Sequence, residues 1–236
     1  MIPREQVLVL AAQESSRLRG GLVDAGWTLT DTDCGMGTYF RDIDAIAHYA
    51  DSRWIIRPAA VNSFPQVLLS PMAAHECWPG HHLQIARQPD TPWWGWANAS
   101  SEGWATYAET LPHEAGIPNT DGLGYLVFHL WRAVRAVVDT GIHARGWTRS
   151  QGRAYYYDNT PLPALWVEIE LAAIFAQPAM RMSHWYGLQT YRALRDETEN
   201  RLGNRFDVHA YHQFLLDLGR GTLPSLRKRV AAWEPQ

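Results

Sequence analysis

The chain has 236 residues, of which 46% are hydrophobic and 19% are charged, and its formal net charge is −3. This composition excludes a disordered chain, and the slight negative charge argues against a nucleic-acid partner that is held through its phosphates. No apolar stretch reaches the roughly 18 residues of a membrane span, so we also expect no membrane partner.

Two cysteines, Cys34 and Cys77, are too few for a disulfide framework and lack the spacing of a metal knuckle. We interpret Cys77 as a small buried core residue and not as a nucleophile or a ligand. The first residues of the chain lack the basic start and the long apolar run of a signal peptide. These observations favour a reducing compartment and predict a cytoplasmic protein.

The first predicted element is an amphipathic helix over residues 4–19, whose apolar residues share one face. The pair Gly20-Gly21 is expected to end this helix. Between about 25 and 66 the pattern breaks into short pieces that are punctuated by glycine, proline and aspartate. Residues 54–56 and 67–69 are the best candidates for short strands.

Helical spacing dominates from residue 70 onwards. A helix that starts after Ser70-Pro71, with Ser70 as its N-cap, is predicted to carry His75 and Glu76. A second helix begins near residue 100, and later helices are expected at 122–140, 148–158, 162–175, 178–201 and 206–218. We therefore predict a mainly α fold with few short strands. It forms a single domain over 1–236, in which a less regular N-terminal segment (1–64) packs on a helical core (65–226).

The most informative stretch is Ala74–Gln84, which reads AHECWPGHHLQ. In the H-E-x-x-H motif, two histidines at i and i+4 bind zinc, and the glutamate activates a water. Here the i+4 position is proline, and the next histidines are His81 at i+6 and His82 at i+7. On a straight helix, i+7 returns to the same face about 10 Å away. A bulge at the Pro-Gly pair would instead bring His81 to the usual i+4 place. Spacing therefore leaves both histidines open as ligands.

A third protein ligand is expected from a later segment, because zinc hydrolases use three and keep one position for water. Glu102 is the candidate, since it lies near the start of the next predicted helix. Glu102, Thr106 and Glu109 share one face of that helix. This placement allows Glu102 to bind the metal and Glu109 to orient another ligand.

The same donor set fits other metals, because two histidines and one carboxylate also describe a non-haem iron site. Glu76 beside His75 favours hydrolysis, since an oxygenase requires no base there. A His-Glu pair in a helix is by itself commonly a surface feature. The three histidines and one glutamate between His75 and His82, followed by Glu102, favour a metal site.

These motifs resemble those of a bacterial family, domain-of-unknown-function family 885, which is grouped with the gluzincin-type metallopeptidases. The matching stretches are HExxPGHHLQ from His75 and EGWAxYAE from Glu102. The likeness continues through Arg135–His143 and Gly146–Thr148, and it becomes fainter from Phe206 onwards. It covers about residues 65–226.

The resemblance implies a zincin-like helical metallohydrolase core that binds Zn²⁺. By likeness to shorter gluzincin motifs, it favours His81 over His82 as the second ligand. The implied metal ligands are therefore His75, His81 and Glu102, with Glu76 as the general base. Four further residues would orient ligands or contact substrate: His82, Glu109, Arg135 and Asp139.

The resemblance also places His143, which follows the helix of Arg135 and Asp139, where it would stabilise an oxyanion or position the substrate. The plainer alternative for Arg135 and Asp139 is an i, i+4 ion pair on that helix. His184 stands where the family typically has a tyrosine. Its imidazole can still donate to an oxyanion, so we count it among the catalytic residues.

Members of the family are usually much longer, with an N-terminal helical region that helps to wall the cleft. Most of that region has no counterpart here. We therefore expect a more open cleft, or one completed by a second copy in a homodimer.

The leading hypothesis is a zinc-dependent hydrolase that cleaves an amide or peptide-like bond, in a small-molecule or peptide-like substrate, with Glu76 taking a proton from the attacking water. One alternative is an iron or manganese enzyme that performs other chemistry in a biosynthetic pathway. Another is a relative that binds a ligand or partner without catalysis.

Overall fold

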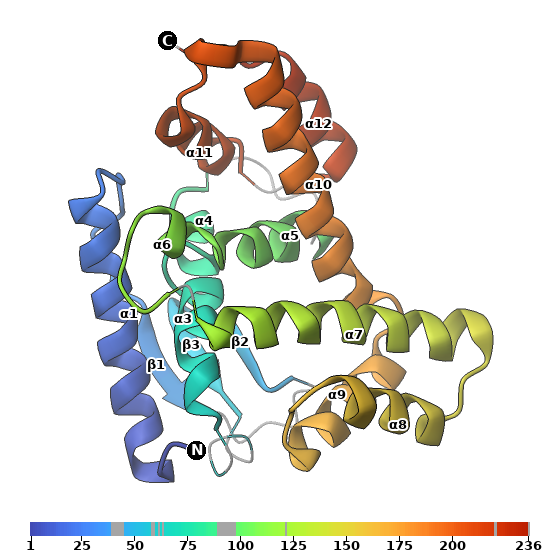
Figure 1. Ribbon diagram of the computed structural model, residues 1–236. Coiled ribbons are helices and arrows are strands. Elements are labelled where there is room, and N and C mark those ends of the chain that lie inside the picture. The colour runs from blue at the N-terminus through green and yellow to red at the C-terminus, as the bar shows by residue number, and fades with distance from the viewer. Residues whose placement is uncertain are drawn as a thin grey trace.

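The computed structural model describes residues 1–38, 45–57, 60, 62, 64–88, 98–120, 122–219 and 221–235. Within these ranges the chain is mainly helical, with one small sheet near its N-terminus, which confirms the predicted mainly α fold with few short strands (Figure 1). In the described part of the chain, no helix is both long and apolar enough to cross a membrane.

The N-terminal segment opens with a 3-10 turn (Arg4–Gln6) and helix α1 (Val7–Asp24). The prediction that Gly20-Gly21 would end this helix is wrong, because α1 runs on to Asp24. Gly21 instead permits a close approach, since a Cβ there would lie 2.8 Å from the side chain of Ile117. The chain turns at Gly26, whose φ of +86° suits glycine.

The sheet lies within the segment that the sequence indicated as less regular. Its strands are β1 (Gly35–Thr38), β2 (Ala47–Ala50) and β3 (Arg53–Ile56), in the order β1-β3-β2. Strand β3 runs parallel to β1 and antiparallel to β2. The predicted strand at 54–56 is thus confirmed. The strand predicted at 67–69 is wrong, because those residues form a 3-10 turn and the start of a helix. A short apolar run by itself does not distinguish a strand from a buried helical segment.

Several short helices follow the sheet in the described part of the chain. They are α3 (Leu69–Glu76), α4 (His81–Ala86), α5 (Asn98–Ala108) and α6 (Leu111–Glu114). Helix α3 begins at Leu69 after a 3-10 turn (Gln66–Leu68), and no side chain caps it, so the N-cap role predicted for Ser70 is wrong. Because the incoming turn already satisfies the first backbone groups, the helix starts before the serine.

The C-terminal half of the chain consists of further helices, two of which are long (Figure 1). They are α7 (Leu123–Arg145), α8 (Arg149–Asn159), α9 (Ala164–Ala176), α10 (Met180–Leu202), α11 (Val208–Asp217) and α12 (Leu223–Ala231). The first five match the predicted helices closely. Helix α7 continues past its predicted end at Thr140-Gly141 and stops at Gly146, which has a φ of +69°. Helices α5 and α10 touch at Gly103 and Gly187, where a Cβ on Gly103 would lie 2.6 Å from the other glycine's Cα.

The two cysteines form a disulfide between Cys34 and Cys77. Cys77 is buried in the core, as predicted, but the expectation that the two cysteines form no disulfide is wrong. Cys34 precedes strand β1, and Cys77 directly follows helix α3. The bond therefore fastens the sheet segment to the helix that carries His75 and Glu76.

Candidate metal centre

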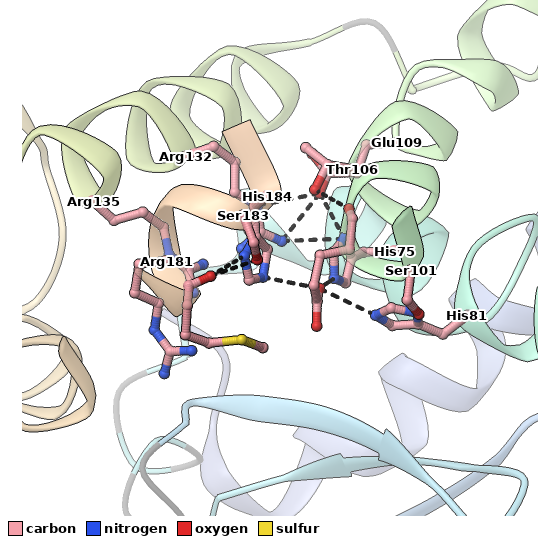
Figure 2. Close-up of polar contacts among 12 residues, drawn as sticks. His75, His81, Ser101, Thr106, Glu109, Arg132, Arg135, Arg181, Ser183 and His184 are labelled. Carbon is pink, nitrogen blue, oxygen red and sulfur yellow. Dashed lines mark hydrogen bonds and ion pairs between the residues drawn. The ribbon is translucent and has the colours of Figure 1, made fainter. Parts of the chain in front are cut away.

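Three helices bring their polar side chains together at one buried point. His75 lies near the end of α3, His81 is the first residue of α4, and Glu102 lies in α5. One nitrogen of each histidine and one carboxylate oxygen of Glu102 all lie within 4.8 Å of one another. The Nε2 atoms of His75 and His81 are each 3.4 Å from Glu102 Oε2. In Figure 2 the imidazoles of His75 and His81 turn toward the same point.

A sharp reversal of the chain, and not a bulge in one helix, brings His81 to this point. Helix α3 ends at Glu76, and α4 starts again at His81. Gly80 packs directly on the last turn of α3, because a Cβ there would lie 1.9 Å from the carbonyl oxygen of His75. A glycine is therefore required at this position.

His82 points away from the cluster, toward the N-terminal segment. Its Nδ1 lies 3.0 Å from the Tyr49 hydroxyl, and its Nε2 lies 2.7 Å from the backbone oxygen of Thr32. Its side chain is fully buried. Both ring nitrogens are thus used in packing α4 on the sheet segment, and the structure places His81 rather than His82 among the candidate ligands.

Glu109 fixes the orientation of His75. The His75 Nδ1–H donates to Glu109 Oε1 over 2.8 Å, and Arg132 donates to the same oxygen over 3.1 Å. Burial raises the pKa of the Glu109 carboxyl, but the opposing effect of Arg132 and His75 is larger. The net shift of the pKa is downward, so the group stays ionised. With the proton held on Nδ1, His75 presents the lone pair of Nε2 to the cluster.

The donor set fits a divalent cation. Burial raises the pKa of Glu102, but the imidazoles of His184 and His81 hold it well below its usual range. Among the described residues, Glu102 Oε2 has no well-formed hydrogen bond, although three imidazole nitrogens lie within 3.4 Å of it. Two imidazole nitrogens and one carboxylate oxygen are a common set for zinc and also suit iron or manganese. A cation at this point would satisfy an otherwise costly buried acceptor.

A cavity of about 840 Å³ opens beside these residues. Glu76, next to His75 on α3, lines it, and its Oε2 atom is buried with no hydrogen bond to any described residue. The carboxylate is therefore available to a molecule in the cavity. Apolar side chains form much of the remaining wall, among them Ile46, Met72 and Phe128.

Helix α10 delivers His184 to the same cavity. The His184 Nε2 lies 2.9 Å from Glu102 Oε2, and its ring is parallel to that of His75 at a centroid distance of 6.0 Å. Figure 2 shows the two rings facing each other. The contact between His184 and Glu102 is at an ion-pair distance without a well-formed hydrogen bond, and His184 also lines the cavity, so its ring lies within reach of a ligand there.

Sequence reasoning missed Arg181, which lines the cavity together with Arg135. It precedes His184 by three residues on α10, so helical spacing places the two on one face, and this signal was present in the sequence. Arg135 does not pair with Asp139, as the alternative interpretation had it. Its Nε lies 3.3 Å from the buried carboxylate of Glu170 on α9.

Asp139 and His143 are not brought to the cavity. The Asp139 carboxylate accepts hydrogen bonds from the backbone N–H groups of Ala179, Arg181 and Met182, so it caps the start of α10. His143 Nε2 lies 2.8 Å from the backbone oxygen of Ile174. The structure thus gives both residues structural contacts, and it gives no support to the roles in substrate binding and oxyanion stabilisation that were predicted for them.

A family model described as "Bacterial protein of unknown function (DUF885)" matches residues 48–230, and the chain belongs to this family. No curated protein matches the chain. Among solved structures, it is similar to a "putative lipoprotein" from Colwellia psychrerythraea, with a TM-score of 0.84 and 27% identity, over 98% of this chain and 43% of that one. It is also similar to a "putative lipoprotein of unknown function" from Shewanella oneidensis, with a TM-score of 0.77 and 19% identity, over 98% and 46%. The chain thus spans less than half the length of each.

Proposed function

We propose that the chain is a zinc-dependent hydrolase that cleaves an amide or peptide-like bond. The observation that carries this proposal is the convergence of His75, His81 and Glu102 in a buried cavity that Glu76 also lines. Their order along the chain supports a gluzincin-like arrangement, in which the general base directly follows the first ligand. A zincin-like core is part of the same proposal.

Zinc held by these three residues would supply a Lewis acid that lowers the pKa of water and polarises a carbonyl group. Glu76 would accept the proton from the attacking water and pass it to the leaving nitrogen. His184 would donate from Nε2 to the carbonyl oxygen as negative charge develops on it. Glu109 would hold His75 in the orientation that ligation requires.

The test is the variant Glu76→Gln, compared with the wild type against a panel of N-acyl amino acids and short peptides. The proposal predicts that hydrolysis falls at least about 100-fold while the metal content is unchanged, since general acid–base catalysis contributes about that much. Arg149→Gln, at an exposed ion pair with Glu168, is the control and should keep full activity. Undiminished hydrolysis by the Glu76 variant would overturn the assigned mechanism.

The identity of the bound metal separates the alternatives. Zinc supports hydrolysis, whereas iron or manganese at the same residues would favour the non-hydrolytic enzyme. A protein that binds no metal after reconstitution would favour a binding role without catalysis.

The disulfide supports a proposal about compartment that replaces the cytoplasmic expectation. That expectation depended on two free cysteines, whereas Cys34 and Cys77 are bonded, and disulfides persist in oxidising compartments such as the bacterial periplasm. The two similar structures are described as lipoproteins, which is consistent with the cell envelope. Thiol alkylation of protein isolated from its native cells should find neither cysteine free. Quantitative labelling of both would contradict this proposal.

A further inference from the structure

The cavity has a second polar end, away from the metal ligands, formed by the guanidinium groups of Arg135 on α7 and Arg181 on α10. We call it the arginine end. Both side chains are about 5% exposed, and both line the cavity. Figure 2 shows Arg135 and Arg181 on the same side of His184, opposite His81.

A single carboxylate, that of Glu170, faces both guanidinium groups. Its Oε2 lies 3.3 Å from Arg135 Nε and its Oε1 lies 3.9 Å from Arg181 Nε. The same Oε2 also accepts hydrogen bonds from the Trp131 indole and the Tyr156 hydroxyl. Glu170 is therefore shared between two hydrogen-bond donors and two guanidinium charges, and Arg135 Nε makes no well-formed hydrogen bond to any described residue.

The position of Arg135 is fixed before any ligand binds. Its guanidinium lies 5.4 Å from the centre of the Trp131 ring, which is a stacking distance. Burial lowers the pKa of Arg135 to about 10, and the nearby Arg181 and Arg132 act in the same direction while Glu170 opposes them. The group is still charged at neutral pH, and a further anion beside it would be favourable.

We propose that the arginine end binds a free carboxylate of the substrate, so that the chain acts on N-acyl amino acids or on peptides next to their C-terminus. The planar guanidinium fork matches a carboxylate better than it matches a neutral amide. This proposal rests on the proposed function, which specifies the bond that is cut. It adds that the enzyme recognises its substrate by a free carboxylate.

The walls of the cavity also indicate the kind of side chain that accompanies the carboxylate. Phe128 and Trp131 form apolar wall, and Met182 and Tyr186 line the cavity with side chains that are 41% and 57% exposed. Apolar side chains of this size suit an aromatic or large aliphatic residue.

The experiment measures the binding of N-acetyl-L-phenylalanine and of its neutral primary amide to the zinc-supplemented full chain by calorimetry. The expected result is that the acid binds at least about tenfold more tightly than the amide, as hydrogen bonds to charged groups provide. The variant Arg135→Gln should lose this preference. The matched surface variant Arg149→Gln should keep it.

Equal binding of acid and amide by the wild type would overturn the proposal, whatever the variants do. A preference that persists in Arg135→Gln would also overturn it, because recognition of the carboxylate would then not depend on the Arg135 guanidinium. If Arg135→Gln folds poorly, Arg135→Lys takes its place in the test. It keeps the positive charge but not the planar guanidinium, so it should retain only part of the preference for the acid. Metal content is measured in parallel, so a failure of the metal site is distinguished from a failure of the arginine end.

Discussion

Glu102 and Glu170 are both buried and ionised, and both line the same cavity. Their neighbouring side chains, however, are of different chemical kinds. Glu102 faces the imidazoles of His75, His81 and His184. Glu170 faces two guanidinium groups, an indole and a phenol. An imidazole can present either a proton or a lone pair, whereas a guanidinium or an indole can only donate.

The difference explains why one carboxylate is a candidate metal ligand and the other is not. The neighbours of Glu102 can turn lone pairs toward a cation that the carboxylate also binds. Two of the neighbours of Glu170 carry positive charge and the Trp131 indole can only donate, so a cation there would be repelled. The two ends of one cavity thus suit ligands of opposite charge, a metal ion at one end and an anion at the other.

The largest effect is expected from Glu102→Gln. This variant should lose more than about 100-fold in zinc affinity, because even removing a supporting residue of a metal ligand costs about 10- to 100-fold. Zinc titration against a competing dye measures the affinity, and circular dichroism checks the fold. Zinc binding at full affinity would show that Glu102 is not a ligand.

Glu170→Gln should act on stability and leave zinc binding intact. Two buried guanidinium groups lose their shared counter-charge, so the free energy of unfolding should fall by about 3–5 kcal/mol. Glu168 lies two residues earlier on α9 and pairs with Arg149 and Arg153 at the surface. Glu168→Gln is the matched control and should cost less than about 1 kcal/mol in urea unfolding. Equal effects of the two variants would contradict the account.

Glu109→Gln should have a smaller effect on the metal end. His75 Nδ1 would keep an acceptor but lose the negative charge beside it, so zinc affinity should drop by about 10- to 100-fold. The same dye competition measures it. A zinc affinity equal to that of the wild type would show that Glu109 does not support His75.

Acid pH should reduce the difference in the free energy of unfolding between the wild type and Glu170→Gln. Burial raises the pKa of Glu170, but the opposing effect of Arg135 and Arg181 is larger, so the net shift is downward from 4.5. A depressed carboxyl pKa contributes stability above the unfolded-state value, and this contribution is lost as pH falls through the folded-state value. Urea unfolding at pH 7 and near pH 4 should therefore show a smaller difference in the free energy of unfolding at the lower pH. A difference that does not change with pH would contradict this prediction.

The sequence predicted most helices, because helices depend on short-range spacing, and it singled out His75, Glu76 and Glu102, which the structure brings to one cavity. It left His81 and His82 open, since the choice depends on how α4 restarts after Gly80. It could not reveal the disulfide, because the pairing of Cys34 with Cys77 depends on where the sheet segment packs.

His143 and Asp139 show a second limit of sequence reasoning. They lie on the same helix as Arg135, and spacing gave no reason to separate them. The structure separates them because Asp139 is used to cap α10 while Arg135 turns toward Glu170. The arginine end likewise joins α7, α9 and α10, so long-range packing and not local spacing defines it.

The most direct test of the central claim is the metal content of the full chain purified without added metal, beside His75→Ala. Elemental analysis should find about one zinc per chain in the wild type and almost none in the variant, because the proposed zinc site has His75 as one of its three protein ligands. The absence of stoichiometric metal from the wild type, even after reconstitution with zinc, would contradict the account.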